Sequence, residues 1–225
     1  MKKLLYAAVP TILITNCLYS QEITDAQRKY LVTLVTKMQG TVEIVEDEHS
    51  PASVAVTFDK LNDLQLSQLK KSPALYSLTV NDASMISDRA MPYLATCTEL
   101  VKLKLHAAKL TSNSMPQIAK LTKLRYLYLA ESKISDLGVS HLKSLENLEE
   151  IDLTSTLITD KAGPFLAEFP ALKTISVNTT AFGDRGVGAL QTLKKLEKLN
   201  AINTRVTNDG AQALEKEVPT VRIRR

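Results

Sequence analysis

A pattern of apolar residues that returns every 24 residues constrains the fold of this chain more than any other feature. Self-similarity at a period of about 20 to 50 residues is typical of a solenoid, in which a short unit buries its apolar face only by stacking on its neighbours. The 225 residues are therefore expected to form one elongated array. The clearest two copies are Leu124, Leu127, Leu129 and Ile134-Ser135-Asp136, followed by Leu148, Ile151, Leu153 and Ile158-Thr159-Asp160.

Each copy begins with the strand pattern L-x-x-L-x-L. Because side chains alternate across a strand, the last two apolar residues of the pattern point inward and the residues around them point outward. The array starts at Val54, one residue inserted after Val80 makes the first step 25, and Val221 to Ile223 is expected to be a final strand that is out of register. The six complete patterns start at Leu75, Leu100, Leu124, Leu148, Leu172 and Leu196.

A short helix is expected after each strand. Apolar residues three positions apart follow the strand patterns, and this is the spacing of one helical turn. The residue before each pair is small or polar, which would let adjacent helices approach closely. The pairs are Met91 and Leu94, Met115 and Ile118, Val139 and Leu142, Val187 and Leu190, and Ala211 and Leu214.

Two polar columns recur in the same way. A row of acids suggests cation binding, but an acid or hydroxyl at a helix start also caps free amide groups and complements the helix dipole. We therefore interpret the acidic column as helix capping, and a hydroxyl column as satisfying backbone groups inside the turn. The acids are Asp63, Asp88, Asp136, Asp160 and Asp184, and the hydroxyl residues are Ser132, Thr156, Thr180 and Thr204.

Residues 1–20 have the features of a signal peptide. Lys2 and Lys3 precede an apolar run that is too short to span a bilayer comfortably. Cleavage after Ser20 lowers the formal net charge from +4 to +2, with 26 basic against 24 acidic residues, and this near-balance does not favour nucleic acid as a partner. We expect a secreted or periplasmic protein, and the alternative is a lipid-anchored structural protein of the cell envelope with Cys17 lipidated.

Cys97 is the one cysteine that such cleavage would leave, so an internal disulfide is not expected. Its equivalents in the next four repeats are all apolar. Cys97 is therefore expected to be a small buried core residue rather than a reactive thiol. The equivalent residues are Leu121, Leu145, Phe169 and Leu193.

The residues before the array are expected to cap its open apolar end, since a terminal repeat must hide that face. We assign residues 21–52 to this cap and residues 53–225 to the array. Helical spacing over residues 22–39 predicts a helix with Thr24 or Asp25 as its capping residue.

A half-buried strand is expected after this helix, because Val42 and Ile44 alternate with polar residues. The polar segment 46–51 then predicts a loop. Its three acids stand beside His49 but are contiguous, and this favours a solvated turn over a metal site.

The repeating unit resembles the leucine-rich repeat, and most of all the 24-residue variety of secreted bacterial proteins, which has Thr in place of the usual Asn. Residues 148–166 show its form, L-x-x-L-x-L-x-x-T-x-I-T-D-x-G-x-x-x-L, with Ala162 in place of the Gly. The resemblance covers residues 54–223 and implies an α/β solenoid: a right-handed arc with a parallel sheet on the concave side and short helices on the convex side, generally used to bind other proteins. Ala108 lacks the hydroxyl and Ser112 the acid, which leaves the regularity of that turn open.

Catalytic, cofactor and metal motifs do not accompany the repeat. His49, His106 and His141 lie in unrelated positions and form no metal-ligand pair in the sequence. The segment 138–142 fails the G-x-S-x-G nucleophile elbow because Leu142 stands at the last glycine position, and no phosphate-binding loop is visible. We therefore expect a non-enzymatic protein without a cofactor.

The outward residues of three consecutive strands form a basic, an aromatic and an acidic row about 4.8 Å apart. Tyr combines apolar area with a polar tip and is enriched at binding surfaces. We expect a monomer that binds a protein or peptide here, with a carbohydrate as the alternative ligand, although the same residues would also keep an exposed face soluble. The candidate binding residues are Lys102, Lys104, His106, Tyr126, Tyr128, Glu150, Asp152, Ser176 and Asn178.

Overall fold

The computed structural model describes residues 24–47 and 50–225, so the expected signal peptide and Cys17 lie outside the described residues. Within them, nine strands form one sheet, and their order in space is their order in the chain. The strands are β1 (Thr41–Asp47), β2 (Ser50–Asn62), β3 (Leu75–Met85), β4 (Lys102–Leu105), β5 (Tyr126–Tyr128), β6 (Glu150–Asp152), β7 (Thr174–Ser176), β8 (Lys198–Asn200) and β9 (Arg222–Arg224).

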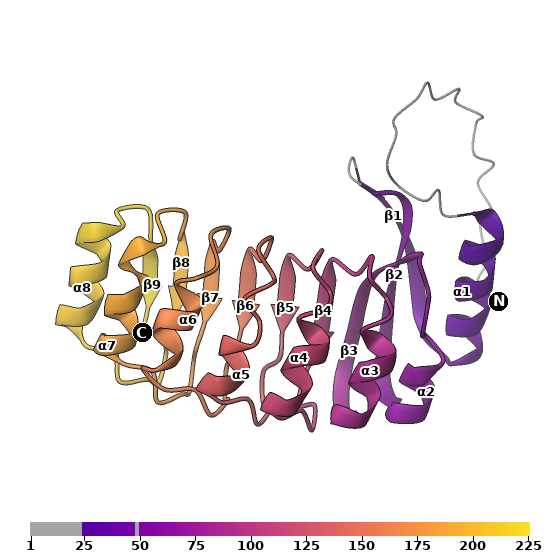
Figure 1. Cartoon of the computed structure of the whole chain (residues 1–225), viewed down its shortest axis with the longest axis horizontal. Helices are drawn as coiled ribbons and strands as arrows, with labels where there is room; N and C mark the ends of the chain where they lie inside the picture. The colour runs from indigo at the N-terminus through magenta and orange to yellow at the C-terminus, as the bar shows by residue number, and fades with distance from the viewer. Residues whose placement is uncertain (1–23, 48–49) are drawn as a thin grey trace, which may run out of the picture.

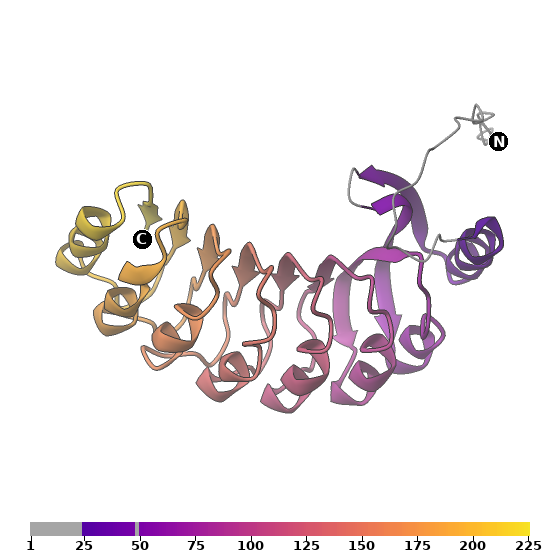
Figure 2. The ribbon, with the colours of Figure 1, turned by 45° about the horizontal axis from the view of Figure 1, so that its top comes forward.

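Short helices follow the strands and lie along one side of the sheet. Figures 1 and 2 show an arc in which the strands line the concave side and the helices line the convex side. The α-helices are α1 (Asp25–Lys37), α2 (Asp63–Ser67), α3 (Met91–Leu94), α4 (Met115–Ile118), α5 (Asp136–Ser140), α6 (Ala162–Leu166), α7 (Asp184–Ala189) and α8 (Asn208–Glu217), and the 3₁₀ turns are η1 (Asp88–Ala90), η2 (Ser112–Ser114) and η3 (Leu190–Thr192).

The strands from β2 to β9 are parallel, and their register follows the repeat. Leu103, Leu127 and Ile151 pair in succession, each 24 residues after the last. Leu127 is buried, whereas its neighbours Tyr126 and Tyr128 are half-buried on the other face of the strand. The alternation predicted from the sequence is therefore confirmed.

The last strand keeps this register, so the expectation of a strand out of register at Val221 to Ile223 was wrong. β9 pairs Ile223 with Leu199, which lies 24 residues before it. Thr220 stands where the pattern has leucine, and its hydroxyl donates to the carbonyl of Leu196 over 2.8 Å. Because Val221 still buries its side chain, the stacking continues into this incomplete unit.

One aliphatic core runs through the array. Cys97 belongs to it, as predicted: the side chain is fully buried, its Sγ donates to the carbonyl of Leu69 over 3.1 Å, and burial raises the pKa of the thiol. A thiol with a raised pKa holds little reactive thiolate, so Cys97 is a packing residue. The equivalent residues of the following repeats, Leu121, Leu145, Phe169 and Leu193, are buried as well.

The acidic column was interpreted correctly only in part: most of its acids stand in the first helical turn, where they complement the helix dipole, but their hydrogen bonds go to the next repeat rather than to their own helix. Asp136 accepts hydrogen bonds from the backbone amide and the hydroxyl of Thr159 in the next repeat, over 2.7 and 2.8 Å. Side-chain capping comes instead from the residue before the acid, such as Asn62 and Ser87. An N-cap residue precedes the first helical turn, whereas these acids stand one position further and reach the adjacent unit. The same pair of bonds joins Asp63 to Ser87, Asp88 to Thr111, and Asp184 to Thr207, whereas Asp160 accepts from the backbone amides of Gly183 and Gly186.

Hydroxyl groups complete the remaining turns. At the position without an acid, Ser112 Oγ lies 2.9 Å from Ser135 Oγ and accepts from the Ser135 amide over 3.1 Å. The turn at Ala108 and Ser112 therefore keeps the bridge between repeats, with a neutral group in place of a charged one. The hydroxyl column is confirmed, because each of its members donates to the carbonyl three residues earlier over 2.6 Å: Ser132, Thr156, Thr180 and Thr204.

The N-terminal residues add α1 and β1 to one end of the array. Thr24 caps α1 in a reciprocal capping box with Gln27, so the predicted helix and one of its two predicted caps are confirmed. Leu31 and Val35 of α1 are buried in the same core as the repeats, and β1 is antiparallel to β2. The division into a cap and an array at residues 52 and 53 stays a prediction.

Candidate binding face

The three predicted rows lie side by side on the concave face. Because β4, β5 and β6 pair in parallel, their outward residues stand in two files that cross the strands. Lys102, Tyr126 and Glu150 form one file, and Lys104, Tyr128 and Asp152 form the other, as the register predicted. We call the residue pairs the basic band (Lys102, Lys104), the aromatic band (Tyr126, Tyr128) and the acidic band (Glu150, Asp152).

Each ring of the aromatic band makes a cation–π contact. Lys102 Nζ lies 5.8 Å from the ring centroid of Tyr128, and Arg125 Cζ lies 5.5 Å from the ring centroid of Tyr126. Cations within about 6 Å of a ring centroid are attracted by the ring quadrupole. Burial, followed by the charge of Glu150 and its hydrogen bond, raises the pKa of Tyr128 well above the usual tyrosine range. Tyr128 is therefore a neutral hydrogen-bond donor throughout the physiological range.

The charges of the basic and acidic bands are not neutralised by ion pairs within the described residues. All four side chains are half-buried and reach solvent. Asp152 accepts from the backbone amide of Thr154 over 2.9 Å, a bond that fixes the carboxylate but leaves its charge. The face thus presents positive and negative charge separately, on either side of two tyrosines.

The other three predicted residues lie outside these bands. His106 follows the end of β4, and its Nε2 is 3.6 Å from Oε1 of Glu131. Ser176 is almost fully buried and accepts from the Asn200 amide over 2.8 Å. Asn178 accepts from the backbone amide of Ile202 over 2.9 Å, so it joins repeats as well as facing the concave side. The structure thus places Ser176 and Asn178 in hydrogen bonds between neighbouring repeats.

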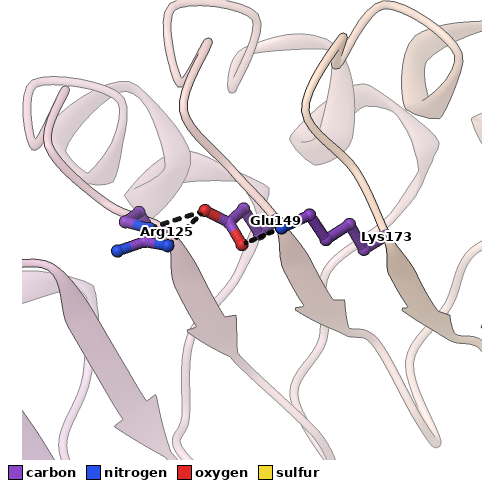
Figure 3. A network of polar contacts seen from close by, with 3 residues as sticks. All are labelled: Arg125, Glu149 and Lys173. Carbon is purple, nitrogen blue, oxygen red and sulfur yellow. Dashed lines mark hydrogen bonds and ion pairs between the residues drawn. The ribbon is translucent and has the colours of Figure 1, made fainter. Parts of the chain in front are cut away.

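A charged network that the sequence analysis missed borders the bands at the start of the strands (Figure 3). Glu149 Oε1 lies 2.6 Å from Arg125 Nη2, and its Oε2 accepts from Lys173 Nζ over 2.9 Å. Arg125 also contacts the ring of Tyr126, so the network reaches the aromatic band. Arg125, Glu149 and Lys173 share the second position of L-x-x-L-x-L, and their alternating sign at steps of 24 residues was a signal in the sequence.

Glu149 is ionised in this network. Burial by itself would raise its pKa, but the hydrogen bonds from Lys173 and Arg125 outweigh burial, and the pKa is lowered. The side chain of Glu149 is 18% exposed, so its two cations are only partly screened by water. The network therefore ties three neighbouring repeats together beside the aromatic band.

Metal-binding and membrane-spanning features are not found in the described part of the chain. Residues 24–47 and 50–225 contain no group of three or more His, Cys, Asp or Glu side chains that could hold a metal ion. Among the same residues, no helix has the length and apolar character needed to cross a bilayer.

Comparisons with known proteins support the fold. The chain matches no family model and no curated protein. Internalin C2 of Listeria monocytogenes has a similar structure, with a TM-score of 0.59 and 18% sequence identity over 70% of this chain and 64% of that one. An internalin (inlF) of the same organism gives a TM-score of 0.47 and 18% identity over 73% of this chain and 57% of that one.

The chain spans less than two thirds of either internalin structure. At this level of identity, the likeness to internalin C2 shows the fold alone. The expected α/β leucine-rich-repeat solenoid is therefore confirmed. The assignment to a secreted bacterial variety with 24-residue units stays a prediction.

Proposed function

We propose that this chain is a non-enzymatic binding module that recognises a protein or peptide through the concave side of its sheet. One observation supports this proposal above the others: the basic and acidic bands flank two tyrosines without forming ion pairs among the described residues. Opposite charges on adjacent strands would pair and stabilise the face, as Arg125 and Lys173 do with Glu149, but here the tyrosine strand keeps the two bands apart.

The size and composition of the face agree with this function. Six strands with three outward residues each provide 18 residues, close to the roughly 20 to 30 per side of a standard protein interface. Tyrosine and arginine are enriched among the residues that dominate binding energy. Tyr126 and Tyr128 lie near the middle of the array, between the basic and acidic bands, so we assign them the largest contribution to binding.

The location of the protein is part of the proposal. Residues 1–20 favour secretion or export to the periplasm, and the alternative is an envelope protein anchored through Cys17. Mass spectrometry of the mature N-terminus distinguishes the two. A free N-terminus at Gln21 supports secretion, whereas a mature chain that starts at a lipid-modified Cys17 supports anchoring.

Capture of the native partner tests the binding face. Tyr126→Ala combined with Tyr128→Ala should reduce capture from native secretions at least tenfold, because truncating one hot-spot residue costs about 2 kcal/mol or more. Tyr93→Ala is the matched control, since Tyr93 is 44% exposed on α3 at the convex side. Undiminished capture by the double variant, with an unchanged melting temperature, would move the site to another surface.

A further inference from the structure

The order of the bands carries information about the partner. Across β4, β5 and β6 the concave face is positive, aromatic and negative in turn, and each band is two residues wide. We infer that the face binds an amphipathic α-helix that lies across these strands and carries an acid, an apolar residue and a base at successive contacts. This inference rests on the proposed function and adds the chemistry of the partner.

The spacing of the bands fits a helix. Neighbouring strands are about 4.8 Å apart, so the basic and acidic bands are separated by about 9.6 Å. A helix rises 1.5 Å per residue, so positions i and i+7 lie on one face about 10.5 Å apart. Position i+3 or i+4 falls midway, opposite the tyrosines. An acid at i, an apolar residue at i+3 or i+4, and a base at i+7 therefore meet the three bands in order.

An extended peptide does not fit the same spacing. Side chains on one face of a strand repeat every two residues, or about 6.7 Å, so contacts at 9.6 Å fall between its positions. A polyproline II segment returns to the same face after three residues, or about 9.3 Å, and it matches the distance. It is narrower than a helix, whose diameter of about 10 Å covers both files of side chains.

The like charges within each band also favour a partner of opposite charge. Glu150 and Asp152 share one strand face without a cation in ion-pair contact among the described residues, and the same holds for Lys102 and Lys104 with respect to an anion. A base of the partner opposite the acidic band and an acid opposite the basic band would relieve both repulsions. The tyrosines between them exclude water from the centre of the contact.

Designed peptides test the inference on the full chain. The matched peptide is an alanine- and glutamine-rich helix of about 21 residues, long enough to hold helical structure in water, with Glu, Leu and Arg at i, i+4 and i+7. The spacing control moves Arg to i+5, on the opposite side of the helix. A third peptide is proline-rich, with Glu and Arg three residues apart. Fluorescence anisotropy at low and physiological salt gives the dissociation constants.

We expect the matched peptide to bind at least tenfold more tightly than the other two. Lys102→Glu with Lys104→Glu should weaken it at least tenfold, and so should Glu150→Lys with Asp152→Lys. All four changes together should restore binding within about threefold, because a helix can turn end to end and meet the reversed bands. If the double variants bound weakly because they were misfolded, combining them would not restore binding.

Three results would overturn the inference. Equal binding of the matched peptide and the spacing control excludes helical register, tighter binding of the proline-rich peptide assigns polyproline II instead, and no recovery in the fourfold variant excludes charge order. The proposed function has its own test. If capture of the native partner still depends on Tyr126 and Tyr128 while the peptides fail, the binding face stands and the helical partner does not.

Discussion

Removing the carboxylate of Asp136 should uncouple two neighbouring repeats. Asp136 at the start of α5 accepts from the amide and the hydroxyl of Thr159, which belongs to the following unit. Asp136→Ala deletes both bonds and leaves the Thr159 amide without this acceptor. Asp136→Asn keeps one acceptor oxygen for the Thr159 amide, removes the charge, and replaces the second oxygen by an NH2 group that can donate to the Thr159 hydroxyl. The pair of variants therefore separates loss of all contacts from loss of the charged acceptor.

The loss of stability in Asp136→Ala can be worked out from these two hydrogen bonds. A hydrogen bond to a charged group contributes about 1.5 to 3 kcal/mol, and removing an acceptor leaves a donor to be satisfied by water. Asp136 and Thr159 are half-buried, so water reaches the site and lowers the cost. We expect Asp136→Ala to reduce the free energy of unfolding by about 2 kcal/mol, and Asp136→Asn by about 1 kcal/mol.

Urea unfolding followed by circular dichroism measures this loss. With a denaturant slope of about 2 kcal/mol per molar, the midpoint of Asp136→Ala should fall by about 1 M. Glu146→Ala is the matched control, because Glu146 is exposed and is assigned no hydrogen bond or ion pair in the described structure. If Asp136→Ala and Glu146→Ala unfold at the same urea concentration, the bridge between repeats contributes nothing to stability and our account of the acidic column is wrong.

Three further predictions concern stability. Ser112→Asp should raise the urea midpoint by about 0.5 M, because a carboxylate can accept from both the amide and the hydroxyl of Ser135, and a lower midpoint would contradict this. Glu149→Gln should be less stable than the wild type at pH 7. Since the folded-state pKa of Glu149 is lowered, its contribution is present above the unfolded-state pKa and is lost as the pH falls through the folded-state pKa, so the difference in midpoint should shrink at pH 3 and a constant difference would refute it. Ser155→Gly should raise the free energy of unfolding by about 0.5 kcal/mol. The left-handed backbone of Ser155 (φ 56°) costs an L-residue about 1 to 2 kcal/mol, and the greater unfolded-state entropy of glycine offsets part of the gain. A thermal melt measures the change, and a lower melting temperature would oppose this account.

The sequence predicted the scaffold well because a solenoid repeats one set of local rules. Leucines at fixed steps can be buried together only if the strands stack in register, so Leu103, Leu127 and Ile151 had to pair. The burial of Cys97 followed from the same rule, since its position is apolar in the next four repeats. The prediction of the last strand failed because Ile223 keeps the 24-residue step from Leu199, although Thr220 stands at the first leucine position of the pattern.

The candidate site was predictable only in part. Alternation and register place Lys102, Tyr126 and Glu150 in one file, and the structure has them there. The hydrogen bonds of Ser176 with Asn200 and of Asn178 with Ile202 depend on how far each side chain leans toward the next strand. Alternation assigns a residue to a face of the sheet, but it does not decide whether that residue faces a partner or a neighbouring repeat.

The sequence by itself determined the repeat, the inward and outward residues of each strand, and the order of the charges across the concave face. These follow from the period and from the geometry of a strand. Only the tertiary structure decided which polar groups join one repeat to the next. Asp136 and Glu149 act on residues 23 and 24 positions away. The period brings such residues close together, but the direction in which each side chain leans toward the neighbouring repeat decides which of them bond.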